Sequence, residues 1–273
     1  IKMTEILLSV FFISVLLLFL STGVWVALSM IGVSTIAMTL FTSRPVGDAM
    51  ATTIWGTSSS WTLTALPLFV WMGEILFRTK LSENLFEGLS PWMQKLPGGL
   101  IHVNVVGCAL FAAISGSSAA TVATVGKMSI PELRKRNYPE KILLGSLAGS
   151  GTLGLLIPPS IILIIYGVTV QESIAKLFVA GIIPGIMIAL IFMSYVILWS
   201  LFNKRKMPNI VNHYSFIDKI KRSGQLIPVI ILILSVIGSI YTGIATATEA
   251  ASLGVVGALI LSYFQKSLSW SNF

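Results

Sequence analysis

Two interrupted apolar segments carry the residues best suited to binding an ion or a small polar solute. The first is broken by Ser115-Gly116-Ser117-Ser118, and the second by three glycines and a pair of prolines within Gly149–Ser160. In hydrocarbon, an interrupted helix leaves backbone N–H and C=O groups without partners, which is costly unless a ligand or neighbour bonds them. Two such breaks in neighbouring segments are typical of solute and ion sites in secondary transporters.

The first break offers donors and acceptors for both a cation and an anion. Ser115, Ser117 and Ser118 supply hydroxyl and carbonyl oxygens, and Gly116 allows a tight backbone turn. Unwound carbonyls suit a sodium ion, whereas half-helix N-termini at the same turn favour a carboxylate. The alternative is a small-residue helix contact, of the kind that Gly, Ala and Ser make in membranes.

The second break cannot lie inside an uninterrupted helix. Pro158 and Pro159 remove two backbone donors, and Gly149, Gly151 and Gly154 precede them. Several carbonyls are therefore expected to be available to an ion. The alternative is a proline kink whose freed groups are bonded by neighbouring helices.

Composition places the chain among integral membrane proteins. Of its 273 residues, 55% are hydrophobic and only 10% are charged, and the mean hydropathy is +0.91. Soluble domains carry about 25% charged residues. The net charge of +8 does not indicate nucleic-acid binding, because the basic residues lie in short loops between apolar runs. We therefore expect an all-α integral membrane protein in a lipid bilayer.

Apolar runs long enough to cross a bilayer recur along the chain. We expect spans at residues 6–21, 24–41, 62–78, 177–202, 226–241 and 244–264. The two interrupted segments are expected as a helical hairpin over residues 98–131 and a broken span over residues 142–170.

Two segments between the spans are too polar to cross. Residues 42–60 are predicted to lie at the membrane interface, which suits Trp55 and Trp61. Residues 81–96 alternate charged and apolar side chains, which predicts an amphipathic surface helix that ends before Pro97-Gly98-Gly99.

Lysine and arginine predict the orientation. They gather around residues 78–95, 134–141 and 204–222, and all three loops are therefore expected on the cytoplasmic side. The first two loops flank the hairpin, so it must enter and return, which makes it re-entrant with Ser115–Ser118 at its tip. The same reasoning places the N-terminus outside.

A short internal match predicts an inverted repeat. Thr-Gly-Val at 22–24 and Thr-Gly-Ile at 242–244 both follow an aliphatic helix and lie 220 residues apart. With opposite directions for the preceding spans, this is the inverted-repeat arrangement of secondary transporters, and a complete chain would have about 440 residues.

The acidic, histidine and cysteine residues of the chain form no pattern that predicts an enzyme. Glu74 and Glu249 lie deepest in apolar context, where ion coupling and a structural role, such as a helix cap at Glu249, both remain open. His102 and His213 stand without companions, and no base accompanies the hairpin serines. Cys108 is expected to pack as a small apolar residue.

Five sequence stretches resemble the large membrane subunit of TRAP (tripartite ATP-independent periplasmic) transporters. The resemblance covers nearly the whole chain, in order. The matching stretches are Leu66-Pro67-Leu68-Phe69-Val70 with Gly73-Glu74, Leu96-Pro97-Gly98-Gly99-Leu100, Ile114-Ser115-Gly116-Ser117, Leu156-Ile157-Pro158-Pro159-Ser160 and Thr246-Ala247-Thr248-Glu249-Ala250-Ala251.

The resemblance implies an inverted-repeat, elevator-type transporter driven by Na+ that imports small organic acids such as C4-dicarboxylates or sialic acid. It implies substrate contacts at Ser115, Ser117 and Ser160. It also implies a sodium site built mainly from backbone carbonyls. Its expected residues are Ser115, Gly116, Ser118, Gly151, Thr152, Gly154 and Pro158.

The resemblance further implies partners, a location and a division of the chain. The partners are a small four-helix membrane subunit and a periplasmic substrate-binding protein, in the bacterial inner membrane. Family members are longer and hold a second hairpin and a second broken helix. The expected parts are scaffold spans (1–97), transport-domain elements (98–170), a span with a basic cytoplasmic loop (171–225) and the start of the second repeat (226–273).

Two rival functions remain open. One is a stand-alone sodium/dicarboxylate carrier of a related elevator class, which would work without a binding protein. The other is a channel or structural membrane scaffold. A channel would give flux that neither saturates nor depends on a sodium gradient.

Overall fold

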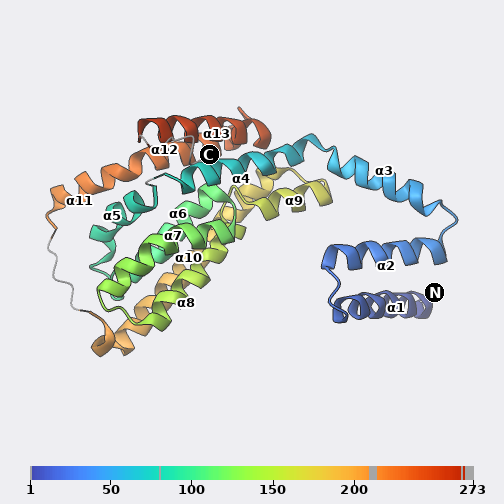
Figure 1. The fold of residues 1–273 in the computed structure, drawn as a ribbon, viewed down its shortest axis with the longest axis horizontal. Coiled ribbons are helices and arrows are strands. Elements are labelled where there is room, and N and C mark those ends of the chain that lie inside the picture. Colours follow the sequence, from blue (N-terminus) through green and yellow to red (C-terminus); the bar gives the residue numbers. More distant parts are fainter. Residues whose placement is uncertain (1, 80, 209–213, 266, 268–273) are drawn as a thin grey trace. The chain divides into compact units, whose positions relative to one another are not determined.

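The computed structural model describes residues 2–79, 81–208, 214–265 and 267, and every regular element within them is helical (Figure 1). The chain forms two compact units, Ile1–Ser59 and Ser60–Phe273. The first unit holds α1 (Lys2–Ser21), α2 (Val26–Phe41) and α3 (Val46–Ser58). The second holds η1 (Trp61–Thr64), α4 (Ala65–Phe77), α5 (Leu81–Met93), α6 (Ile101–Ser115), α7 (Ser118–Lys135), α8 (Glu140–Gly151), η2 (Thr152–Leu155), α9 (Ile161–Val170), α10 (Ile174–Phe202), η3 (Lys204–Lys206), α11 (Phe216–Ser223), η4 (Gly224–Leu226), α12 (Ile227–Tyr241) and α13 (Ala247–Phe264).

Long apolar helices confirm the membrane class. Within the described residues, three are long and apolar enough to cross a bilayer, namely Ile174–Phe202, Phe216–Tyr241 and Ala247–Phe264. A fourth is added if Val46–Ser58 and Trp61–Phe77 count together as one span. The chain is therefore a multi-pass membrane protein.

Both interrupted segments break where their glycines and prolines predict. The helices α6 and α7 pack against each other as a hairpin, joined by Gly116 and Ser117 alone. In the second segment α8 gives way to the short 3₁₀ helix η2, and α9 begins only at Ile161. The α7 helix continues to Lys135, beyond the expected end at residue 131. Entry and return of the hairpin through one membrane face stays a prediction.

The predicted amphipathic helix forms, but it is shorter than expected. The α5 helix buries Leu85, Phe86 and Leu89 against the rest of the second unit. It ends at Met93 instead of at residue 96. Pro97 disfavours helical backbone in the residue before it, so the chain leaves the helix early.

The two Thr-Gly sequences adopt the same local conformation. Gly23 has φ of 80° and Gly243 has φ of 73°, both in the left-handed region that favours glycine. The hydroxyl of Thr22 donates to Phe19 O at 2.7 Å, and that of Thr242 donates to Gly238 O at 2.8 Å. A glycine in this conformation is common where a helix ends, so the internal repeat and its inversion both stay predictions.

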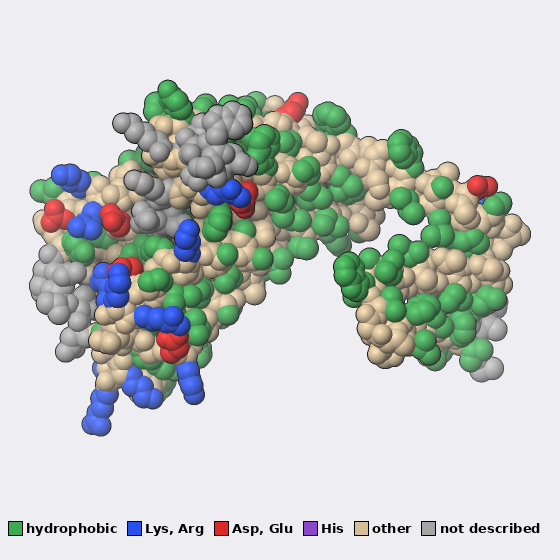
Figure 2. All heavy atoms as spheres, viewed as in Figure 1, with side chains coloured by type: hydrophobic (Ala, Val, Ile, Leu, Met, Phe, Trp, Pro, Cys, Tyr) green, Lys and Arg blue, Asp and Glu red, His purple; other side chains and the backbone are tan. Residues whose placement is uncertain are grey.

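Basic side chains gather toward one end of the second unit. On the face that Figure 2 shows, Lys and Arg concentrate where α5, α11 and the turn between α7 and α8 lie. This clustering supports the expectation that the basic loops share one side of the membrane.

The α6 helix lies at the centre of the second unit. It contacts α4, α5, α7, α8 and α10, and its side chains from Ile101 to Val105 are buried, as is Cys108, which packs as expected. The α4 helix, which contacts α6 on one side, also packs closely against α13, where a Cβ added to Gly254 would lie 2.4 Å from Met72 Sδ. The hairpin is thus held on several sides.

Buried polar groups join α6 to α8. Asn104 Nδ2 donates to Leu143 O at 3.2 Å and to Ser146 Oγ at 3.0 Å. Ser150 Oγ donates to Asn104 O at 3.4 Å. At the base of the hairpin, Leu100 N donates to the hydroxyl of buried Tyr138 at 3.0 Å. These bonds fasten the hairpin to the first half of the broken span.

We expect Asn104→Ala to weaken the contact between α6 and α8. The substitution removes both hydrogen bonds that Asn104 donates to α8, while Leu143 O keeps the bond from Ser146 Oγ, so we expect a cost of about 1 kcal/mol. The midpoint of thermal unfolding of the purified protein in detergent should fall by several degrees. Asn203→Ala is the control, because Asn203 Nδ2 donates only to Trp199 O, at 3.0 Å, at the half-buried end of α10. Equal midpoints for Asn104→Ala and wild type would contradict the assignment.

Candidate functional site

The two breaks meet in space, and we call this contact, between residues 115–118 and residues 151–160, the junction. Ile161 N, the first amide of α9, donates to Gly116 O at 3.3 Å. A Cβ added to Gly116 would lie 2.6 Å from Pro159 O. The sequence segments predicted to form one site are therefore brought together by the fold.

Glycine is required where the two backbones approach most closely. Gly116 has φ of 60°, in the left-handed region, and ends α6. A Cβ on Gly154 would lie 2.9 Å from both Ser117 C and Ser118 N. At these positions even a methyl group would separate the hairpin from the broken span.

The hairpin tip is ordered by its own hydrogen bonds. Ser117 caps α7, and its Oγ accepts from Ala120 N at 3.4 Å. The carbonyl of Ser117 accepts from Thr121 N at 3.0 Å and from Thr121 Oγ1 at 2.8 Å. Thr121 Oγ1 also lies 3.0 Å from Ser115 Oγ. Sequence reasoning missed Thr121, although its position four residues after the capping serine signals this contact.

The three serines predicted to contact substrate differ in exposure. Ser115 is 1% exposed and Ser160 is fully buried. Ser160 Oγ donates to Leu155 O at 2.6 Å, so its hydroxyl proton is already engaged. Ser117 is only half-buried. Of the three hydroxyls, that of Ser117 is therefore the most accessible to a solute.

The predicted sodium ligands include backbone carbonyls and a buried hydroxyl. Within the described part of the chain, none of the backbone hydrogen bonds outside the helices ends on the carbonyls of Ser115, Gly154 or Pro158, whereas that of Gly116 accepts from Ile161 N. The hydroxyl of Ser118 is buried and has no partner there. Such groups are costly to bury, and a bound cation would compensate their oxygens.

The other predicted ligands lie at the start of η2. Gly151 ends α8 and is buried, and a Cβ there would lie 1.9 Å from Val122 Cγ2 on α7. Thr152 is exposed, and its Oγ1 donates to Gly149 O at 2.7 Å. The structure thus assigns Gly151 a packing contact with the hairpin, and leaves the Thr152 oxygen facing outward.

Three glycines outside the predicted site surround the junction, of which only Gly73 belongs to a stretch that carries the family resemblance. A Cβ on Gly73 of α4 would lie 3.0 Å from Ser115 Cα. On α10, a Cβ on Gly181 would lie 2.7 Å from Leu156 O, and one on Gly185 would lie 2.8 Å from Ile157 Cγ1. Glycine within otherwise apolar helices is the signal that could have identified them.

The two apolar-context carboxylates have structural partners. Glu74 pairs with Arg78 at 2.8 Å, and its side chain is 49% exposed. Glu249 forms a capping box with Thr246, whose N donates to Glu249 Oε2 at 2.7 Å, so the predicted cap is confirmed. His102 Nε2 lies 2.8 Å from Pro97 O, while His213 falls outside the described residues.

Comparison with known proteins gives a match over almost the whole chain. A family model described as the DctM component of the tripartite ATP-independent periplasmic transporter matches residues 13–273. The chain is 33% identical, over 79% of its length and 50% of the relative, to the C4-dicarboxylate TRAP transporter large permease protein DctM of Pseudomonas aeruginosa.

Further relatives carry other names. The isethionate TRAP transporter permease protein DctMQ of Oleidesulfovibrio alaskensis is 34% identical over 94% of this chain and 40% of that protein. The sialic acid TRAP transporter permease protein SiaT of Haemophilus influenzae is 33% identical over 75% of this chain and 33% of that protein. The chain spans about half the length or less of these curated relatives.

We expect Gly154→Ala to open the junction. The added methyl group would press on the backbone between Ser117 and Ser118, and overpacking of this kind costs about 1–3 kcal/mol. With Ser117→Cys as a reporter, the rate of thiol labelling at the tip should rise. Gly145→Ala is the matched control, because its Cβ would meet nothing within 4 Å on α8. Equal labelling rates in the two variants would contradict the close packing.

Proposed function

Because the chain belongs to the family of DctM components of TRAP transporters, we propose that it forms part of a large permease that imports small organic anions by sodium coupling. The family description makes it a transport protein and not an enzyme. The relatives are named for C4-dicarboxylates, isethionate, sialic acid and ectoine, and each of these carries a carboxylate or a sulfonate group. A small organic acid is therefore the substrate class we assign.

The observation that carries the proposal is the junction itself. It holds carbonyls of Ser115, Gly154 and Pro158 that accept no backbone hydrogen bond from outside the helices, and a buried hydroxyl at Ser118 without a partner among the described residues. Neutral oxygens of this kind suit Na+, because they supply coordination without a buried charge. Sodium bound here would hold the tip against the broken span, and it would thereby order the loops for a carboxylate near Ser117.

The bonds within the second unit support movement of residues 98–170 as one body. The hairpin is linked to α8 through Asn104 and to α9 through Gly116. In the proposed elevator mechanism this body carries the anion across the membrane, while the remaining spans form the scaffold. Access to the junction then alternates between the two sides.

Family membership supports the proposed partners and location. We assign a small four-helix membrane subunit, a periplasmic substrate-binding protein that delivers the anion, and the bacterial inner membrane. The chain covers only part of the length of these relatives, so the activity of the whole transporter is proposed here for a permease of which this chain forms part.

Reconstitution of the full-length permease with its small subunit in proteoliposomes tests this function. We expect uptake of labelled organic acid to require both an inward sodium gradient and the binding protein. Sodium-dependent uptake without the binding protein would favour a stand-alone carrier. Flux that does not saturate and ignores sodium would favour a channel.

We expect Ser118→Ala to weaken sodium binding, because it removes the unpartnered hydroxyl at the tip. The sodium concentration for half-maximal uptake should rise about tenfold, which corresponds to about 1.4 kcal/mol. Ser129→Ala is the matched control, because Ser129 lies on the same helix and its hydroxyl is also buried without a described partner. A similar sodium dependence in both variants would remove Ser118 from the site.

A further inference from the structure

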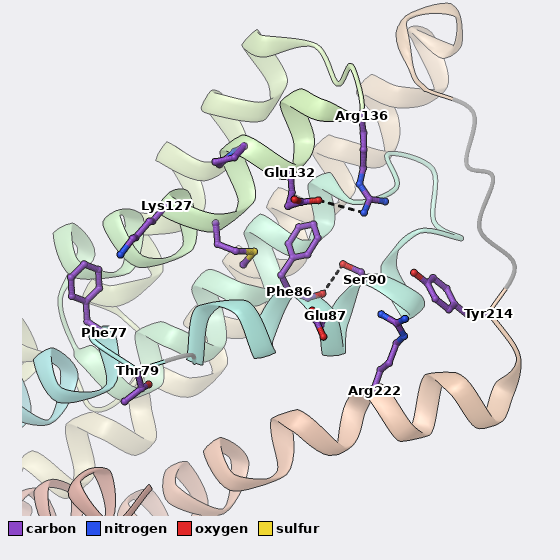
Figure 3. A pocket seen from close by; sticks show the side chains of 12 residues that line it. Phe77, Thr79, Phe86, Glu87, Ser90, Lys127, Glu132, Arg136, Tyr214 and Arg222 are labelled. Carbon is purple, nitrogen blue, oxygen red and sulfur yellow. Dashed lines mark hydrogen bonds and ion pairs between the residues drawn. The ribbon is translucent and has the colours of Figure 1, made fainter. Parts of the chain in front are cut away.

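A cavity of about 540 Å³ lies in the second unit, apart from the junction. It is formed by the end of α4, by α5, by the second half of α7 and by α11 with Tyr214 before it (Figure 3). Its volume is in the range of small-molecule sites. Basic, acidic and aromatic side chains line it together, which is unusual for a lipid-facing surface.

The carboxylates of the cavity are already engaged. Glu132 pairs with Lys135 at 3.2 Å and with Arg136 at 3.6 Å. Glu87 accepts a hydrogen bond from Gln225 Nε2 at 3.2 Å. Glu132 is thus paired with other cations, whereas Glu87 keeps its charge but forms no ion pair with Lys127 or Arg222 among the described residues.

Two cations of the cavity lack a carboxylate partner in the part of the chain that the structure describes. Lys127 Nζ lies 5.7 Å from the centre of the Phe77 ring, and Arg222 lies 4.9 Å from that of Tyr214. The two pairs occupy opposite ends of the cavity in Figure 3. A ring holds a cation without cancelling its charge, so both remain available to an anion.

The register of α11 favours a dissolved anion over a lipid headgroup. Phe216, Ile217 and Ile220 are exposed on one side of this short basic helix, as expected at a membrane surface. At about 100° per residue, Arg222 lies on nearly the opposite side. If the apolar side faces the bilayer, the side that lines the cavity faces water.

Two helices lead from the junction to Lys127. Along α7, Ala119, Ala123 and Lys127 are exposed at four-residue spacing, and Lys127 is the first charged residue after the tip, about 14 Å from Ser118. Along α4, Gly73 lies against Ser115, and Phe77, beneath Lys127, follows one turn later. Small side chains thus separate the junction from the cation.

We propose that this cavity is a second, transient binding site for the transported organic anion on its way to the cytoplasm, and that Lys127 receives its carboxylate. The inference rests on the proposed function and on the predicted cytoplasmic position of this end. An exposed ammonium binds an anion weakly because water screens it, which suits a site that must release its ligand.

Trans-inhibition in proteoliposomes that hold the complete transporter tests the site. Organic acid inside the vesicle should slow uptake by rebinding from the cytoplasmic side. For Lys127→Gln, we expect the internal concentration that halves uptake to rise about tenfold. The KM for the loaded binding protein, which acts from the outside, should stay unchanged. If Lys127 had a merely structural role, the substitution would change this KM and the inhibitory internal concentration together.

Matched variants isolate the charge. Lys127→Arg should behave as wild type, and so should Lys141→Gln, because Lys141 is exposed on α8, forms no ion pair among the described residues and does not line the cavity. Lys127→Cys should regain trans-inhibition after reaction with aminoethyl methanethiosulfonate, which restores a positive charge. The sulfonatoethyl reagent, which adds a negative charge, should not restore it. Native Cys108 is fully buried and does not compete for the reagents.

The outcomes separate this proposal from the proposed function. Absence of sodium-driven uptake in the wild type would refute the function itself. Normal wild-type uptake with unchanged trans-inhibition in Lys127→Gln would overturn only the cavity site, as would equal behaviour of the two thiol adducts. An effect of Lys127→Gln that appears only in vesicles with phosphatidylglycerol would assign the cavity to a lipid headgroup and overturn the proposal as well.

Discussion

The close backbone contact between Gly116 of the hairpin and the Pro159–Ile161 segment is the constraint on which the second unit depends. One hydrogen bond, from Ile161 N to Gly116 O, joins two helix ends that would each be unsatisfied in hydrocarbon. Because the contact is between backbones, it excludes side chains, and glycines occupy the closest positions. Beside this contact the hydroxyl of Ser118 has no partner among the described residues, so the proposed ion would bind next to the groups that close the junction.

Helices around the junction also carry glycine where they approach it most closely. Gly73 on α4 and Gly181 and Gly185 on α10 each permit an approach that a larger residue would prevent. Close approach is how helices gain packing energy in a membrane, where the hydrophobic effect does not drive them together. The tip has two interpretations from its sequence, a small-residue helix contact and a binding site. These two interpretations are compatible, because small residues let the backbones of different segments approach closely and so bring their oxygens near one another.

Sequence patterns predict the helices well and the site in part. Apolar length and the Gly and Pro positions place the breaks at 115–118 and 151–160, because these residues act through local backbone geometry. Family likeness joins the two breaks, and the fold confirms their contact. The buried state of Ser160 and the role of Gly73 could not be predicted, because both depend on which distant helix lies opposite. The cavity beside Lys127 could not be predicted for the same reason, because residues of four separate helices line it.

The tip's own hydrogen bonds have a consequence for biosynthesis. Gly116 and its partner Ile161 are 45 residues apart, so at about 5–20 residues per second the ribosome needs roughly two to nine seconds to supply the second after the first. During that interval the hairpin lacks the segment that later covers it. Thr121 and the cap at Ser117 already satisfy much of the tip. We therefore expect the hairpin turn to form before the broken span is made, with Gly116 O left to be bonded when Ile161 arrives.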